Sequence, residues 1–179
     1  MKLLRYGLPG KEKPGLLDNN GVLRDLSEVV TDIATETLLP VSIDRLRTID
    51  HASLPEVKGG QRLGPCVGQV GNFICIGLNY SDHCKESGMD VPSEPVIFSK
   101  VTSAICGPDD DVIIPRNAIK TDWEVELGVV IGKPARYVDE KSALDHVAGY
   151  CVINDLSERE FQLERDGQWI KGKSCDTFG

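Results

Sequence analysis

The segment from Asp122 to Ile131 alternates acidic and apolar residues with the period of a β-strand. Neighbouring side chains on a strand point to opposite faces, so every second residue shares a face. One face is therefore uniformly apolar and consists of Trp123, Val125, Leu127, Val129 and Ile131. The other face carries Glu124 and Glu126, about 7 Å apart along the backbone at ~3.3 Å per residue. The sequence thus predicts a strand that presents two carboxylates side by side.

Two carboxylates on one strand face repel each other, and removing them from water costs further free energy. A bound cation removes both penalties. Hard carboxylate oxygens suit Mg²⁺ or Mn²⁺, with Ca²⁺ as an acceptable substitute. Glu124 and Glu126 are therefore candidate metal ligands. The alternative is a solvated strand face that binds no metal, because this short motif is weak on its own.

A third carboxylate, Asp155, directly follows the apolar run 150–154, which reads as a strand. A buried strand delivers the side chain at its end to the edge of the sheet. We therefore predict that Asp155 is the third metal ligand. The alternative is a capping role at the helix expected over 158–164, for which Ser157 is an equally good candidate.

Two further segments carry candidate catalytic groups. His83 and Glu86 share one face of a short helix expected over 81–87, so they can act as a general base and its orienting carboxylate. A surface His–Glu pair without a catalytic role is the alternative. Lys173 lies in the Gly-punctuated loop 169–179, where a lysine can neutralise a developing enolate or carboxylate. The letters around it resemble a phosphate-binding loop, but a helix rather than a strand is expected before them.

The remaining pattern predicts a β-rich α+β protein. A small β-rich N-terminal domain and its connector occupy residues 1–65, and a catalytic domain occupies residues 70–179. In the first domain we expect strands over 2–6, 15–17 and 21–26, a turn over 18–21, a helix over 27–39 and a connector from 40 to 70. In the second we expect strands over 73–78, 96–100, 112–115, 123–131 and 150–154 and helices over 81–87, 142–147 and 158–164.

Composition narrows the class of partner. The formal net charge is -8 over 179 residues, which argues against nucleic acid as a partner. No window approaches the roughly 20 apolar residues of a membrane span, and the N-terminus does not resemble a signal peptide. The six cysteines form no CxxC pair. We interpret them as small buried side chains in a reducing compartment, which favours the cytoplasm.

Five motifs occur in an order that resembles a known family. They are Gly77-Leu78-Asn79-Tyr80-x-x-His83, Pro95-Val96-Ile97-Phe98-x-Lys100, Asp122-Trp123-Glu124-Val125-Glu126-Leu127, Asn154-Asp155-x-Ser157-x-Arg159 and Gly172-Lys173-Ser174-x-Asp176-Thr177-Phe178-Gly179. Together they resemble the fumarylacetoacetate hydrolase superfamily over about residues 70–179. The opening, 1–26, resembles the small N-terminal domain of bacterial members.

The resemblance implies a mixed β-sheet roll or sandwich and a role for each matched residue. It implies that Glu124, Glu126 and Asp155 hold Mg²⁺ or Mn²⁺, that His83 with Glu86 moves a proton through a water, that Lys173 stabilises an oxyanion or enolate, and that Arg159, Gln162 and Lys100 contact the substrate. The implied substrate is a small 2-oxo or 2-hydroxy carboxylic acid, including dicarboxylic acids. A homodimer is implied for full-length members.

The resemblance leaves the reaction open. Members carry out C–C hydrolysis, isomerisation, decarboxylation or lyase chemistry on one scaffold, so the fold does not select among them. The sequence type resembles 2-hydroxyhepta-2,4-diene-1,7-dioate isomerase and ureidoglycolate lyase. Members normally continue beyond the position of Gly179, so we expect a truncated chain with an exposed apolar face. The alternative to an enzyme is an inactive fragment or a binding module of this family.

Overall fold

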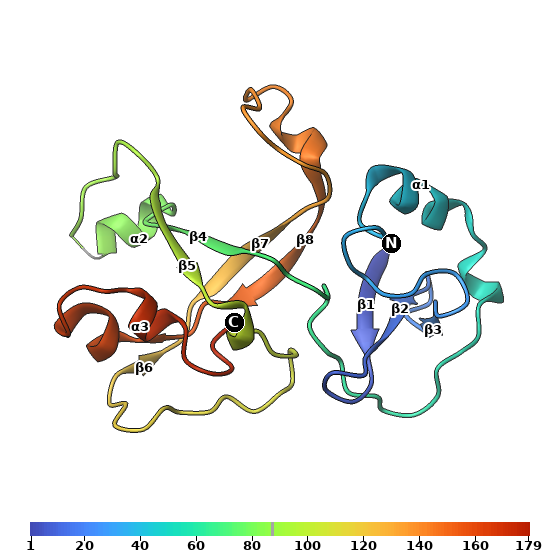
Figure 1. Ribbon diagram of the computed structural model, residues 1–179, viewed down its shortest axis with the longest axis horizontal. Coiled ribbons are helices and arrows are strands. Elements are labelled where there is room, and N and C mark those ends of the chain that lie inside the picture. The colour runs from blue at the N-terminus through green and yellow to red at the C-terminus, as the bar shows by residue number, and fades with distance from the viewer. Residues whose placement is uncertain (87) are drawn as a thin grey trace. The chain divides into compact units, whose positions relative to one another are not determined.

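The computed structural model describes residues 1–86 and 88–179 and has a β-rich α+β fold with short helices (Figure 1). The chain divides into two compact units. Unit 1 consists of Met1–Val70, Cys106–Asp111 and Val125–Ile153, and unit 2 consists of Gly71–Ile105, Val112–Glu124 and Asn154–Gly179. The division predicted from the sequence, at residues 65–70, stays a prediction.

The N-terminal part of unit 1 is a three-stranded antiparallel sheet in the order β1-β2-β3. Its strands are β1 (Lys2–Tyr6), β2 (Lys13–Leu17) and β3 (Leu23–Asp25). The predicted turn between β2 and β3 is confirmed, because the Asp18 carboxylate accepts hydrogen bonds from the backbone amides of Asn20 and Val22 at 2.8 and 3.0 Å. Gly21 has a φ of 77°, which glycine adopts without strain.

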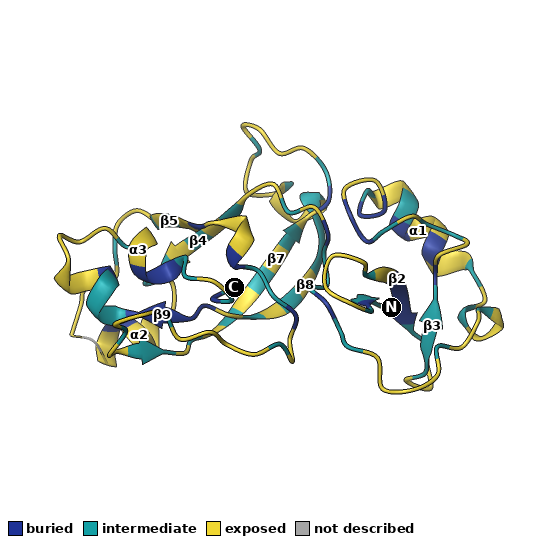
Figure 2. Cartoon of the chain, turned by 60° about the horizontal axis from the view of Figure 1, so that its bottom comes forward, coloured by how far each residue is buried: buried dark blue, intermediate teal, exposed yellow. Residues whose placement is uncertain are grey.

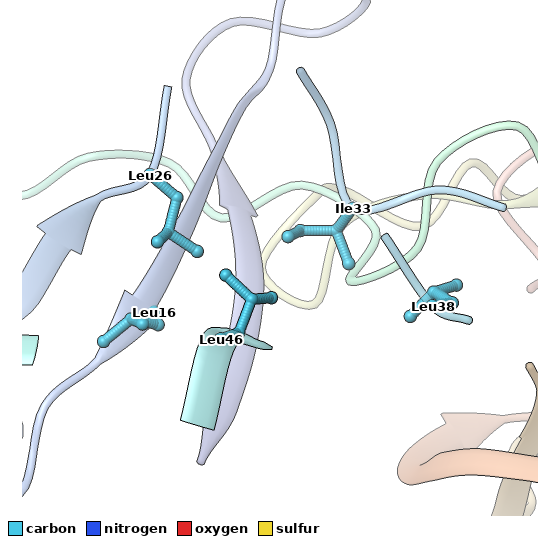
Figure 3. Close-up of a cluster of buried hydrophobic side chains, with 5 residues drawn as sticks. All are labelled: Leu16, Leu26, Ile33, Leu38 and Leu46. Carbon is cyan, nitrogen blue, oxygen red and sulfur yellow. The ribbon is translucent and has the colours of Figure 1, made fainter. Parts of the chain in front are cut away.

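The core of unit 1 lies against this sheet and is shown in Figure 3. Its buried members are Leu16, Leu26, Ile33, Leu38 and Leu46. Fully burying each such side chain contributes about 1.5–3 kcal/mol to the stability of the fold. The apolar residues of the segment after β3 are therefore used for packing, although the segment itself is not helical.

The helix predicted over 27–39 is wrong, because that segment forms a series of turns. The helix of this region is α1 (Pro40–Thr48), within the stretch interpreted as a connector. Proline suits the first turn of a helix, where its missing N–H is not needed. The residue before proline disfavours helical geometry, and Leu39 is extended with φ -62° and ψ 144°.

The second part of unit 1 pairs β7 (Val125–Ile131) with β8 (Val147–Asn154). Burial alternates along β7, which confirms the two-residue period (Figure 2). The apolar face is the exposed one, with Val125 at 68% and Leu127 at 60%. Val129, Ile131, Tyr150 and Val152 are also exposed.

Unit 2 contains two short antiparallel ladders. One pairs β4 (Phe73–Gly77) with β5 (Val96–Lys100), and the other pairs β6 (Thr121–Asp122) with β9 (Ser157–Glu158). The helices are α2 (Ser81–Glu86), a π-helix (Glu160–Glu164) and α3 (Ile170–Lys173). Ser87, which the sequence assigns to the end of the α2 helix, lies outside the described residues.

Several predicted boundaries differ from the observed ones. The strand expected over 123–131 begins only at Val125, and the Glu124 amide before it donates to the side chain of Asn154 at 3.2 Å. The strand expected over 112–115 is wrong, and the Ile113 amide there donates to the Thr177 hydroxyl at 2.8 Å.

Two predicted helices also differ. The first residue of the helix expected over 158–164 belongs to β9, and the π-helix follows it. The helix over 142–147 is a 3₁₀ turn, and similar turns lie at His51–Ser53 and Thr102–Ala104.

The helix α3 was not predicted, since Gly172 in its interior disfavours a helix. The glycine is required by close packing. A Cβ atom at Gly172 would lie 2.4 Å from the carbonyl oxygen of Glu158. The same close approach places Lys173 beside β9, where the candidate site begins.

The cysteines differ from the expectation of general burial, because Cys84 is buried whereas the other five are half-buried. In unit 1 a hydrogen bond between the thiols of Cys66 and Cys151 lowers the pKa of Cys66 to about 7. No helix among the described residues is long and apolar enough to cross a membrane.

Candidate active site

Asp155 is the centre of a buried ion-pair cluster in unit 2. Its Oδ1 accepts a hydrogen bond from Lys100 Nζ at 2.6 Å, and its Oδ2 accepts one from Lys173 Nζ at 2.8 Å. The side chains of Lys100, Lys173 and Asp155 are 0%, 3% and 6% exposed. Buried charges are stable only when they are paired, and each of these three has a partner.

The Lys173 ammonium also donates to Glu124 Oε1 at 3.0 Å. Two of the three predicted metal ligands, Glu124 and Asp155, therefore accept hydrogen bonds from the same ammonium group, that of Lys173. Their backbones are joined as well, because the Asp155 amide donates to the Glu124 carbonyl at 2.9 Å. Asp155 directly follows β8, and its side chain binds lysines instead of capping a helix, whereas its role as a metal ligand stays a prediction.

Arg159 closes the cluster on its other side. Its Nε and Nη2 donate to Asp122 Oδ2 at 2.9 and 2.8 Å, and the guanidinium also forms an ion pair with Glu124. Its Nη1 donates to the buried Gln162 side chain at 3.0 Å. Two predicted substrate contacts, Arg159 and Gln162, thus lie together beside a predicted metal ligand.

Lys100 and Lys173 reach Asp155 from different elements. Lys100 ends β5 and also donates to the Leu156 carbonyl at 3.0 Å. Burial lowers the pKa of Lys100 below its ordinary value, although the charge of Asp155 opposes that change. Lys173 ends α3, and its Nζ lies 5.2 Å from the centroid of the Phe98 ring.

Glu158 is a buried carboxylate that the sequence reasoning did not single out. It is 0% exposed and accepts hydrogen bonds from the Lys120 amide at 2.9 Å and the Thr121 hydroxyl at 2.8 Å. Burial opposes ionisation of Glu158, but these bonds and further backbone amides outweigh it and hold its pKa below the ordinary range. Its neighbours in sequence, Ser157 on β9 and Arg159 directly after β9, both contact Glu124, so Glu158 anchors the segment that carries them.

The remaining predicted residues are His83, Glu86 and Glu126. His83 and Glu86 both lie on α2 and are exposed. Glu126 lies on β7 in unit 1, whereas Glu124 and Asp155 belong to unit 2. The acid–base pair and the third metal ligand therefore stay predictions.

The donor chemistry of the cluster fits a hard divalent cation. Glu124 Oε1 and Asp155 Oδ2 both lie within 3.0 Å of one cationic nitrogen, so two carboxylate oxygens converge on one point. Across residues 1–86 and 88–179, no group of three or more His, Cys, Asp or Glu side chains is arranged to hold a metal ion. A complete site therefore needs a further ligand or a rearrangement of these side chains.

Comparison with known proteins decides the family. Residues 72–179, more than half of the chain, match the family described as "Fumarylacetoacetate (FAA) hydrolase C-terminal". The chain belongs to the fumarylacetoacetate hydrolase family. A Burkholderia multivorans protein, whose name provisionally assigns it to the hydrolases, is 63% identical over all 179 residues. The chain spans 64% of the length of that relative.

Solved structures share the fold of this fumarylacetoacetate hydrolase family chain. A fumarylacetoacetate hydrolase from Exiguobacterium antarcticum is 35% identical with a TM-score of 0.77 over 99% of the chain and 63% of its own length. A 2-hydroxyhepta-2,4-diene-1,7-dioate isomerase from Mycobacterium marinum is 29% identical with a TM-score of 0.66 over 99% of the chain and 62% of its own. The fold expected from the resemblance is confirmed.

Proposed function

We propose that this chain carries the charged centre of a metal-dependent enzyme that acts on a small 2-oxo or 2-hydroxy carboxylic acid. The observation that carries the proposal is the convergence of Glu124 and Asp155 on the buried ammonium of Lys173. Membership of the fumarylacetoacetate hydrolase family supports it.

In the proposed site Glu124 and Asp155, joined by Glu126, hold Mg²⁺ or Mn²⁺. The ion, when bound, supplies a Lewis acid that polarises a substrate carbonyl. The protein contributes carboxylates that are already oriented, since Asp155 is fixed by Lys100 and Glu124 by Arg159. Such preorganisation lowers the cost of assembling the site.

The cationic side chains provide the complement to an anionic substrate. Lys173 neutralises the negative charge that develops on an enolate or oxyanion. Arg159 presents a planar guanidinium, which is suited to a carboxylate, and Asp122 and Gln162 fix its plane. His83 with Glu86 takes or returns the proton at the reacting carbon or at an attacking water.

The same groups serve hydrolysis, isomerisation, decarboxylation or a lyase reaction. Two of the similar solved structures support the first two, because their names give a fumarylacetoacetate hydrolase and a 2-hydroxyhepta-2,4-diene-1,7-dioate isomerase. Dienoate isomerisation needs a proton moved between carbons and a stabilised dienolate. The proposed pair of His83 and Lys173 supplies both functions.

Calorimetric titration with oxalate, a stable two-carbon analogue of a 2-oxo acid, tests the proposed function. We expect the chain to bind oxalate in excess Mn²⁺ and to lose that binding in EDTA. The Arg159→Lys variant keeps the positive charge but loses the planar guanidinium that can bind a carboxylate through two N–H groups. Its oxalate affinity should therefore fall about tenfold, which corresponds to about 1.4 kcal/mol of binding free energy.

The Arg165→Lys variant is the matched control, because Arg165 pairs with Glu160 on the same segment and is 47% exposed. Its oxalate affinity should equal that of the unmodified chain. Oxalate binding that is unchanged by EDTA or by Arg159→Lys would contradict the proposed site.

A further inference from the structure

The ion-pair cluster around Asp155 balances its own charge. Its anions are Asp122, Glu124 and Asp155, and its cations are Lys100, Arg159 and Lys173. Three positive and three negative side chains leave this cluster neutral. The three carboxylates are therefore already neutralised by the three cations. A divalent cation added to the cluster would bring two positive charges in excess.

Lys173 has a different position from the other two cations. Its Nζ lies between Glu124 Oε1 and Asp155 Oδ2, at 3.0 and 2.8 Å. A metal ion held by both carboxylates needs these same oxygens and is repelled by an ammonium that remains between them. A buried lysine in this position is a competitor for the metal.

The other cations are held by contacts that do not join the two carboxylates. Lys100 Nζ bonds Asp155 Oδ1 and the Leu156 carbonyl, and its side chain is 0% exposed. Arg159 is fixed to Asp122 by two of its nitrogens. Lys173 instead ends a four-residue helix, and the Phe98 ring beside its Nζ can hold a displaced ammonium by a cation–π contact.

We propose that Lys173 is an internal counter-ion that holds Glu124 and Asp155 together until a divalent cation replaces it. This inference rests on the proposed metal-binding function and adds an exchange to it. The exchange frees the Lys173 ammonium for an anionic substrate, so metal entry and substrate recognition are coupled through one side chain. Because the exchange moves positive charge without breaking a covalent bond, it requires no further reactant.

The affinity of the purified chain for Mn²⁺, measured by electron paramagnetic resonance of the free ion, tests the competition. Lys173→Met removes the competing ammonium, so we expect at least about tenfold tighter Mn²⁺ binding than in the unmodified chain. Lys171→Met removes an equal charge two residues away on the same helix, where the side chain bonds the Arg165 carbonyl. Its Mn²⁺ affinity should stay within about twofold of the unmodified value, because an exposed charge is screened.

The exchange itself has a second readout that needs no variant. In the unmodified chain, Mg²⁺ should increase acylation of Lys173 by a water-soluble reagent, followed by mass spectrometry, while acylation of Lys171 stays constant. If Lys173→Met shows no cooperative melt in EDTA, Mn²⁺ should restore one, because the ion replaces the lost counter-charge.

The outcomes separate this inference from the proposed function. Tighter binding by Lys173→Met together with Mg²⁺-dependent acylation supports the exchange. If the unmodified chain binds Mn²⁺ but Lys173→Met binds it equally or more weakly, the exchange is overturned while the metal function stands. Acylation of Lys173 that is unchanged by Mg²⁺ also overturns it. If neither protein binds Mn²⁺, both the metal function and the exchange fail.

Discussion

Replacing Asp155 by asparagine is expected to lower the free energy of unfolding by about 3–5 kcal/mol, the usual cost of removing one partner from a buried ion pair. The substitution leaves two ammonium groups, Lys100 and Lys173, inside the protein without their shared carboxylate. The amide of asparagine has almost the same shape, so lost charge rather than lost packing is the cause. Urea unfolding at neutral pH measures the effect.

Asp176→Asn provides the matched control for this experiment. Asp176 is exposed and lies three residues after Lys173, the end of α3. Its replacement should change the free energy of unfolding by less than about 0.5 kcal/mol. If Asp155→Asn were as stable as the control, the two lysines would not depend on Asp155, and the described cluster would be wrong.

Replacing Glu158 by glutamine is expected to cost roughly 2–4 kcal/mol at neutral pH, since hydrogen bonds to a buried carboxylate are strong. Glu158 accepts bonds from Lys120, Thr121 and Glu160. A glutamine amide nitrogen cannot accept any of these bonds. Because the substitution weakens the anchor of β9, it should also reduce the order of Arg159.

The cost of Glu158→Gln should depend on pH. The folded-state pKa of Glu158 lies below its ordinary value of about 4.3, so its contribution is present above that value and is lost as pH falls through the folded-state pKa. The stability difference between the two proteins should therefore narrow below about pH 4. Glu164→Gln is the control, because Glu164 pairs with Lys120 at the surface and is 52% exposed. A difference that stayed constant from pH 7 to pH 3 would show that ionisation of Glu158 contributes nothing.

The parts of the fold predicted correctly are those with a strong local signal. The alternation over Val125–Ile131 and the turn at Asp18 depend on neighbouring residues, and both are confirmed. The helix α1 was missed because its buried apolar residues, Ile43 and Leu46, are too few to give a clear period, and proline at its start was interpreted as a breaker. Helix α3 was missed because Gly172 disfavours a helix by its local propensity. The contact with Glu158 that requires a glycine there is a tertiary contact, which no local pattern shows.

The candidate site shows the same limit. The sequence groups Glu124 and Asp155 as metal ligands, and the structure places both carboxylates on the Lys173 ammonium, while their role as metal ligands stays a prediction. It does not predict that Lys100 pairs with Asp155, since 55 positions separate the two residues and no local pattern links them. The buried role of Glu158 is hidden for the same reason, because its donors at 120 and 121 lie almost 40 positions earlier.

Thermal unfolding of the purified chain with and without Mn²⁺ tests most directly whether Glu124 and Asp155 form a cation site. A ligand that binds only the folded state at a hundredfold excess over its Kd stabilises it by about 2.7 kcal/mol. We expect Mn²⁺ to raise the melting temperature of the unmodified chain and of Glu94→Gln, an exposed control, but not of Glu124→Gln. Equal melting temperatures in Mn²⁺ and EDTA for the unmodified chain would contradict the proposed metal site.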